Sequence, residues 1–183
     1  YRREFFAPKE WQGRTVLLTF EAVAHDATVF CNGRRVFHHG CGYTAFTVDL
    51  TESLRLGEQN VVAVRSDSRE ALNSPPFGGQ IDFLTYGGIY RAVTLDVKEP
   101  AYLRDIAIEA HAEGDFRIYT STVGETVGCT LQAEIRSPAG SRALYSGELS
   151  LPIVGTLNGV HPWSIGHPFL YTLTVRLIRP GTS

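Results

Sequence analysis

The sequence is short of the features that mark membrane and nucleic-acid proteins. It contains no apolar run near the roughly 20 residues that a membrane-spanning helix needs. It also lacks a basic surplus, because 17 Lys and Arg residues against 19 Asp and Glu residues give a formal net charge of -2. Phosphate backbones and anionic lipids select basic surfaces. We therefore expect no nucleic-acid partner and no membrane partner.

The chain also lacks an initiator methionine. Its first residues, Tyr1–Phe6, do not form the charged and apolar regions of a signal peptide. We therefore expect a fragment cut from a longer polypeptide, and the compartment stays open because a signal peptide could lie upstream.

Cysteine is scarce, and Cys31, Cys41 and Cys129 form an odd set without a C-x-x-C pair. This pattern implies neither a disulfide framework nor a thiolate zinc site. Free thiols are typical of a reducing compartment, which favours the cytoplasm. We predict no metal and no cofactor; the adjacent His38 and His39 would point to opposite faces of a strand and could not chelate one ion together.

No useful length of the chain repeats its apolar residues at helical spacing. Short runs of period two, separated by turn residues, predict an all-β protein instead. In the first of these, Val16, Leu18 and Phe20 share one face. Further runs at 46–49 and 60–66 continue the pattern, and together they predict a jelly-roll sandwich.

The dipeptide Asn32-Gly33 is the strongest short hairpin signal, because both residues tolerate the positive φ of a type I′ turn. The strands on either side are predicted at Ala27–Cys31 and Arg34–His38. In this register Arg34, not Cys41, lies opposite Cys31.

The stretch Ser68–Gly88 breaks the rhythm with about twenty residues of loop. Loops of that length in compact domains are functional or disordered, and the aromatics Phe77, Phe83 and Tyr86 argue against disorder. The loop runs directly into the alternating strand Ala92–Val97.

A second series of strands follows Glu99-Pro100, and it ends in a clear apolar face formed by Tyr171, Leu173, Val175 and Leu177. Several short strands without a helix predict an immunoglobulin-like β-sandwich. We therefore predict a jelly-roll, galactose-binding-domain-like sandwich at 1–99 and an immunoglobulin-like sandwich at 100–183. Trp163 and Tyr171 are interpreted as core of the second sandwich.

Several motifs, in this order, resemble family 2 of the glycoside hydrolases, which contains β-galactosidases and β-glucuronidases. They are Tyr1–Phe5 with Trp11–Arg14, Phe20–Val23, Val29–Gly33, His39–Thr44, Asp49–Thr51, Tyr86–Arg91, Trp163–Pro168 and Leu170–Leu173. The resemblance covers nearly the whole chain. It departs from the family at Cys41, where a glycine is more usual, and in lacking residues ahead of Tyr1, so we expect an edge strand to be missing.

The resemblance implies that the parent polypeptide is a retaining glycosidase. Family members use two glutamates on a (β/α)₈ barrel, about 5–5.5 Å apart. The chain has no Asn-Glu dipeptide, the local signature of the acid/base. Glu4, Glu10, Glu21 and Glu70 are expected to be solvated. We predict no catalytic residue here, no hydrolysis by these residues alone, and a C-terminal barrel as the partner within the same polypeptide.

The family's aspartate at the position of Asp82 implies a hydrogen bond to substrate hydroxyls. The alternative is a turn aspartate that accepts backbone N–H bonds near Tyr86. Tyr86 and Phe83 are candidates for stacking on a sugar ring, although packing of the loop is the commoner role of such aromatics. Arg91 is predicted to anchor the loop by pairing with a carboxylate or with loop carbonyls.

Three functions remain open at this point. The leading one is a scaffold of a β-galactosidase, with Asp82 favouring galactose because a carboxylate facing a uronic acid would repel it. Within this first function, the alternative is another family 2 glycosidase such as a β-glucuronidase. The second function is an autonomous carbohydrate-binding module. The third is a structural pair of sandwiches without a ligand. The resemblance also allows a homo-oligomer, as family members are commonly oligomeric.

Overall fold

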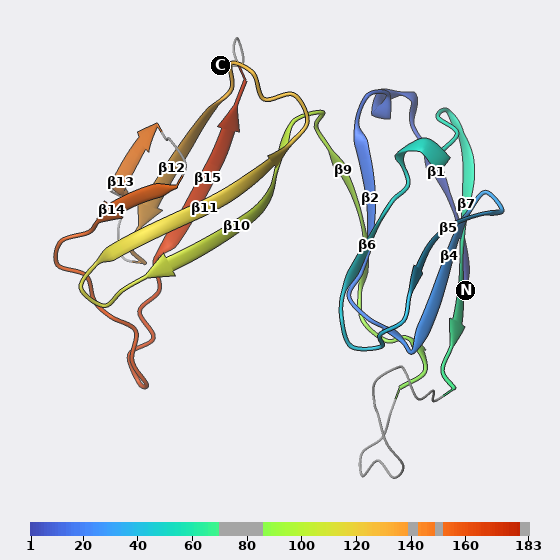
Figure 1. The fold of residues 1–183 in the computed structure, drawn as a ribbon, viewed down its shortest axis with the longest axis horizontal. Coiled ribbons are helices and arrows are strands. Elements are labelled where there is room, and N and C mark those ends of the chain that lie inside the picture. The colour runs from blue at the N-terminus through green and yellow to red at the C-terminus, as the bar shows by residue number, and fades with distance from the viewer. Residues whose placement is uncertain (70–85, 139–142, 149–151, 180–183) are drawn as a thin grey trace. The chain divides into compact units, whose positions relative to one another are not determined.

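A computed structural model describes residues 1–69, 86–138, 143–148 and 152–179. Within these residues the chain forms β-strands and two short 3₁₀ helices, η1 (Lys9–Trp11) and η2 (Thr51–Ser53), which confirms the all-β prediction. The chain separates into two compact units, Tyr1–Glu99 and Pro100–Ser183 (Figure 1).

The first unit is a sandwich of two main sheets (Figure 1). One sheet has the strand order β1-β7-β4-β5, the other has the order β6-β2-β9, and β3 pairs with β8. Their bounds are β1 (Arg2–Ala7), β2 (Thr15–Phe20), β3 (Val23–Ala24), β4 (Asp26–Cys31), β5 (Arg34–His39), β6 (Phe46–Asp49), β7 (Glu58–Asp67), β8 (Gly88–Ile89) and β9 (Val93–Lys98).

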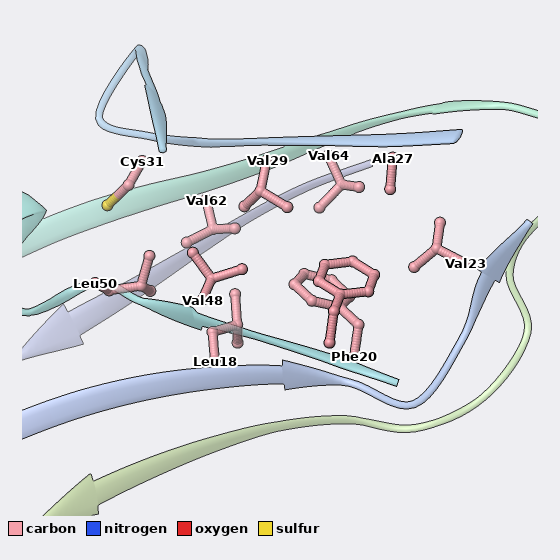
Figure 2. Close-up of a cluster of buried hydrophobic side chains, with 11 residues drawn as sticks. Leu18, Phe20, Val23, Ala27, Val29, Cys31, Val48, Leu50, Val62 and Val64 are labelled. Atoms are coloured by element: carbon pink, nitrogen blue, oxygen red, sulfur yellow. The ribbon is translucent and has the colours of Figure 1, made fainter. Parts of the chain in front are cut away.

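The core of the first unit lies between these sheets. Side chains of β4 and β7 point toward those of β2 and β6 in Figure 2. Val16, Leu18 and Phe20 are all buried on one face of β2, as the period-two pattern predicted. The cluster consists of Leu18, Phe20, Val23, Ala27, Val29, Cys31, Phe46, Val48, Leu50, Val62 and Val64.

The predicted hairpin is confirmed. Asn32 and Gly33 both have positive φ, 50° and 83°, between β4 and β5. Arg34 lies opposite Cys31 in the register.

Replacing Gly33 by alanine is expected to destabilise the first unit by about 1–2 kcal/mol, the cost of a left-handed conformation for a residue with a Cβ. No atom lies within 4 Å of the position that the Cβ would take, so the cost comes from the backbone alone. Urea unfolding followed by Trp11 fluorescence in a Trp163→Phe background measures it. Gly40→Ala, whose Cβ would come no closer than 4.0 Å to His38, is the control and is expected to be neutral. Equal stabilities of the two variants would contradict the argument.

Two asparagines tie the hairpin to β7. The Asn32 Nδ2 donates to the Ser53 carbonyl (2.9 Å) and to the Asn60 Oδ1 (2.8 Å). The Asn32 Oδ1 accepts the Val61 N–H (3.0 Å). Asn60 is fully buried, and its side chain satisfies backbone groups of the turn that precedes β7.

The second unit is a sandwich of two three-stranded sheets, β10-β11-β14 and β13-β12-β15. Its strands are β10 (Tyr102–Ala110), β11 (Asp115–Val123), β12 (Thr130–Arg136), β13 (Ala143–Glu148), β14 (Ile153–Thr156) and β15 (Thr172–Ile178). Its buried core contains Phe116, Ile118, Ala133, Ile135 and Ile153. Tyr171, Leu173 and Val175 pack against this core, as their shared face predicted.

The prediction that Trp163 belongs to this core is wrong, because its side chain is 58% exposed. Ser164 and His167 exchange two backbone hydrogen bonds (3.2 and 3.0 Å) in a tight turn, with Gly166 at a φ of 87°. This turn lies outside the two sheets. Tyr171, in contrast, packs on the core and accepts the His161 N–H at its hydroxyl (2.8 Å).

Candidate functional site

The two flanks of the long loop are held together at one end of the first unit. Asp67, the last residue of β7, pairs with Asp26, and Gly88 of β8 pairs with Ala24. The Ser66 hydroxyl donates to the Ala24 carbonyl (2.9 Å), and the His25 N–H donates to the Asp67 carbonyl (2.9 Å). The backbone that leads into the loop is therefore bonded, through residues 24 and 25, to the backbone that leads out of it.

Asp82 and Phe83 lie outside the described residues. Their assignment as sugar-contacting residues therefore stays a prediction. The described part of the site consists of the flanks and the turn that follows β5.

Tyr86 and Tyr90 form an aromatic pair beside the loop. Their rings stack at a centroid distance of 5.5 Å with an interplanar angle of 17°. The Tyr90 hydroxyl donates to the Gly42 carbonyl (2.7 Å), which fixes its ring against the turn after β5. Tyr86 is 68% exposed. Carbohydrate rings present apolar C–H faces of the kind that aromatic side chains bind.

Arg91 contacts Tyr90, one ring of this pair. Its guanidinium carbon lies 5.5 Å from the centroid of the Tyr90 ring, within the range of a cation–π interaction. The predicted pairing with a carboxylate or loop carbonyls stays a prediction, because the loop itself is outside the described residues. Sequence reasoning missed Tyr90, although it belongs to the same Ile89–Arg91 motif.

His25 lies next to Gly42, in the turn after β5, and is only 3% exposed. Its Nδ1 has no hydrogen-bond partner among the described residues. A side chain on Gly42 would come within 3.0 Å of that nitrogen and 3.2 Å of the Ala24 backbone. The Tyr43 ring lies edge-on to the imidazole at 6.5 Å. Gly42 therefore lets the turn lie close over the histidine, a contact that no pattern in the sequence predicts.

Asp67 and Arg69 form an ion pair at the start of the loop. The Arg69 Nη2 donates to the Asp67 Oδ2 (2.5 Å), and its Nε donates to the Oδ1 (2.9 Å). The Arg69 N–H also donates to the Oδ1 (3.1 Å). These side-chain and backbone hydrogen bonds from Arg69 hold the pKa of the Asp67 carboxyl well below its usual range.

We expect this ion pair to stabilise the fold above about pH 4, the ordinary pKa of an aspartate. The stabilisation is expected to be lost as the pH falls below that value. Folding lowers the pKa of the Asp67 carboxyl, so protonation of that carboxyl favours the unfolded state. Arg69 is exposed, so the effect on stability is small. A carboxyl NMR titration should give Asp67 a low pKa that returns toward normal in Arg69→Gln. An unchanged Asp67 titration in that variant would contradict the assignment.

The histidines and cysteines considered as metal ligands are not gathered at one place. The Nε2 of His38 lies 2.7 Å from the Asp26 Oδ2, and the Nε2 of His39 lies 2.9 Å from the Thr44 Oγ1. Cys31, Cys41 and Cys129 are free thiols. In the part of the chain that the structure describes, no three His, Cys, Asp or Glu side chains are grouped for a metal ion. None of the described helices is long and apolar enough to cross a membrane.

Residues 1–100 match the family described as glycosyl hydrolases family 2, sugar binding domain, and residues 101–183 match glycosyl hydrolases family 2. A β-galactosidase of Thermoanaerobacter pseudethanolicus is 31% identical over 97% of this chain and 26% of the relative. A β-glucuronidase of Bacteroides fragilis is 38% identical over 52% of this chain and 13% of the relative.

Among solved structures, a Faecalibacterium prausnitzii β-glucuronidase superimposes with a TM-score of 0.86 at 27% identity. The match covers 97% of this chain and 34% of that structure. The chain thus spans about a quarter of the length of the Thermoanaerobacter pseudethanolicus enzyme and about a third of the solved structure. The two family matches together cover residues 1–183, and the chain therefore belongs to family 2 of the glycosyl hydrolases.

Proposed function

We propose that these residues are the non-catalytic N-terminal region of a retaining glycosidase that hydrolyses terminal β-galactosides. The observation that supports the galactoside is the similarity to β-galactosidases along nearly the whole chain. The Thermoanaerobacter pseudethanolicus enzyme and a Bacteroides ovatus β-galactosidase are each 31% identical over 97% and 98% of it. Because the chain spans 26% and 22% of these relatives, the activity belongs to the whole protein.

The first unit contributes one sugar-contacting loop in this proposal. Asp82 accepts hydrogen bonds from substrate hydroxyls, and Phe83 and Tyr86 offer rings to the sugar. Support comes from the flanks of the loop. The Ser66 hydroxyl bonds the Ala24 carbonyl, the His25 N–H bonds the Asp67 carbonyl, and Tyr86 stacks on Tyr90. Arg91, over the Tyr90 ring, stabilises the returning flank.

The covalent chemistry takes place elsewhere in the whole protein. In this proposal a C-terminal barrel carries the acid/base and the nucleophile. The role of these residues is to place hydroxyl-binding groups at the edge of a pocket that the barrel completes. Contacts between these groups and substrate hydroxyls form away from the reacting bond. Their binding energy orients the substrate for attack.

A β-glucuronidase is the second candidate. It is favoured by the Faecalibacterium prausnitzii structure, with its TM-score of 0.86 at 27% identity, and by the Bacteroides fragilis relative. A carboxylate at position 82 argues against it if that side chain faces the uronic acid, because like charges repel.

Assays of the whole protein with p-nitrophenyl β-galactoside and p-nitrophenyl β-glucuronide test the proposal. We expect the kcat/KM for the galactoside to be higher by at least about tenfold, which corresponds to about 1.4 kcal/mol of transition-state discrimination. The reverse ratio would make the protein a β-glucuronidase. Hydrolysis of neither substrate, together with micromolar binding of galactose by residues 1–183, would favour an autonomous binding module.

A further inference from the structure

The sequence contains two Asn-Gly dipeptides, Asn32-Gly33 and Asn158-Gly159. Asparagine is one of the chemically labile residues of proteins. Its amide is lost most readily when glycine follows, because glycine has no Cβ and its backbone nitrogen can approach the asparagine side chain closely. Both dipeptides lie in turns, and the two glycines have positive φ, 83° and 68°. No atom lies within 4 Å of the position that a Cβ would take on either glycine. The two sites therefore differ mainly in what holds the asparagine.

The Asn32 amide is held at both of its polar atoms. Its Nδ2 donates to the Ser53 carbonyl (2.9 Å) and to the Asn60 Oδ1 (2.8 Å), and its Oδ1 accepts the Val61 N–H (3.0 Å). Both amide hydrogens are therefore used. Attack by the next backbone nitrogen requires this amide to rotate and to lose all three hydrogen bonds. Asn32 can then react only when the turn opens locally.

The Asn158 amide has no such support. Asn158 and Gly159 form an exposed turn after β14. Among the described residues, no hydrogen bond reaches the Asn158 side chain. The amide can therefore rotate toward the Gly159 nitrogen without first breaking any contact.

We propose that Asn158 is a site of spontaneous deamidation and that the hydrogen bonds of Asn32 protect the other Asn-Gly dipeptide from the same reaction. The Gly159 nitrogen attacks the Cγ of Asn158, and an N–C bond forms. The bond between Cγ and Nδ2 breaks, and Nδ2 leaves as ammonia with the proton of the glycine nitrogen. Water then opens the cyclic imide at one of its two carbonyls and gives aspartate or isoaspartate. Water is the only co-reactant.

Deamidation at this site changes the loop between β14 and β15 (Figure 1). Leu157 and Val160, on either side of the turn, line a mainly apolar cleft of about 410 Å³ in the second unit. The backbone N–H of Leu157 donates to the turn after β10 (2.9 Å), and that of His161 donates to the Tyr171 hydroxyl (2.8 Å). Both products place a carboxylate beside the cleft. Isoaspartate also adds one carbon to the backbone between these two hydrogen bonds.

Peptide mass spectrometry of the whole protein after incubation at mildly alkaline pH tests the proposal. Cleavage after arginine places Asn32 in the peptide 15–34 and Asn158 in the peptide 143–176, and each is the only asparagine of its peptide. Digestion in heavy-oxygen water marks any amide that is lost during the digestion itself.

We expect deamidation of the folded protein to be at least about a hundredfold faster at Asn158 than at Asn32, because Asn32 reacts only from its opened form. In urea, where neither side chain keeps its native contacts, the two rates should agree within about threefold. Gly159→Ala is the matched variant and should slow the reaction at Asn158 by at least about tenfold, since a Cβ hinders the approach of the nitrogen.

Two results would overturn the proposal. Equal rates at the two asparagines in the folded protein would show that the hydrogen bonds of Asn32 give no protection. An Asn158 that stays intact in the folded protein but reacts in urea would show that the folded turn does not allow the attack. Both readouts are peptide masses, so they are independent of glycosidase activity and of the substrate.

Discussion

Replacing Asn60 by alanine is expected to lower the free energy of unfolding of the first unit by about 3–4 kcal/mol. The Asn60 Oδ1 accepts the Arg55 N–H (2.8 Å) and an Nδ2–H of Asn32 (2.8 Å). Its Nδ2 donates to the carbonyls of Arg55 (2.9 Å) and Glu58 (3.0 Å). The side chain is fully buried, so alanine would leave several polar groups without partners at a site from which water is excluded.

Urea unfolding of residues 1–183 in the Trp163→Phe background, followed by Trp11 fluorescence, measures this loss. Gln59→Ala, at the exposed neighbouring position of β7, is the matched control and should change stability by less than about 0.5 kcal/mol. Asn60→Asp should also destabilise, since a carboxylate oxygen would face two carbonyls, but part of the loss should be regained as the pH falls and the carboxyl becomes a donor. Similar stabilities for Asn60→Ala and Gln59→Ala would refute the structural role of the amide.

Replacing Asp82 by asparagine in the whole protein is expected to lower kcat/KM for a β-galactoside about 10- to 150-fold. A hydrogen bond between a charged and a neutral group contributes about 1.5–3 kcal/mol, and each 1.36 kcal/mol is a factor of ten in rate. Asparagine keeps the size of the side chain and removes the charge. Steady-state kinetics of the whole protein measure the effect.

Asp96→Asn is the control for this experiment. Asp96 is an exposed carboxylate of β9 whose nearest cation is Lys98, at 3.8 Å, and its loss should leave kcat/KM unchanged. A fall in melting temperature for Asp82→Asn, with kcat/KM changed less than twofold, would instead assign Asp82 to the turn as an internal acceptor.

The sequence predicted the first unit well where local signals and burial agree. Period two identified the buried face of β2, and Asn32-Gly33 fixed the register of the β4–β5 hairpin because its positive φ angles select one turn type. Trp163 shows the limit of such reasoning. An apolar aromatic residue predicts burial on average, but a tight turn between Ser164 and His167 places it outside the sheets.

The candidate site was harder to predict, since its parts come from distant segments. Asp82, Phe83 and Tyr86 came from the resemblance to a family. The Tyr90 hydroxyl bonds a carbonyl of the turn after β5, and the buried His25 lies close to Gly42 of the same turn. No periodicity in the sequence signals such contacts, because they exist only when the strands have paired.

The pairing of β2 with β9 has a consequence for the order of folding. β6 joins one edge of β2, but the other edge pairs with Val93–Lys98, the last strand of the unit to be synthesised. β1, at the start of the chain, likewise waits for β7. Pairings between distant segments require loop closure before their contacts form, which slows folding. On a translating ribosome, this sandwich therefore gains both neighbours of β2 only after the entire loop from β7 to β9 has been made.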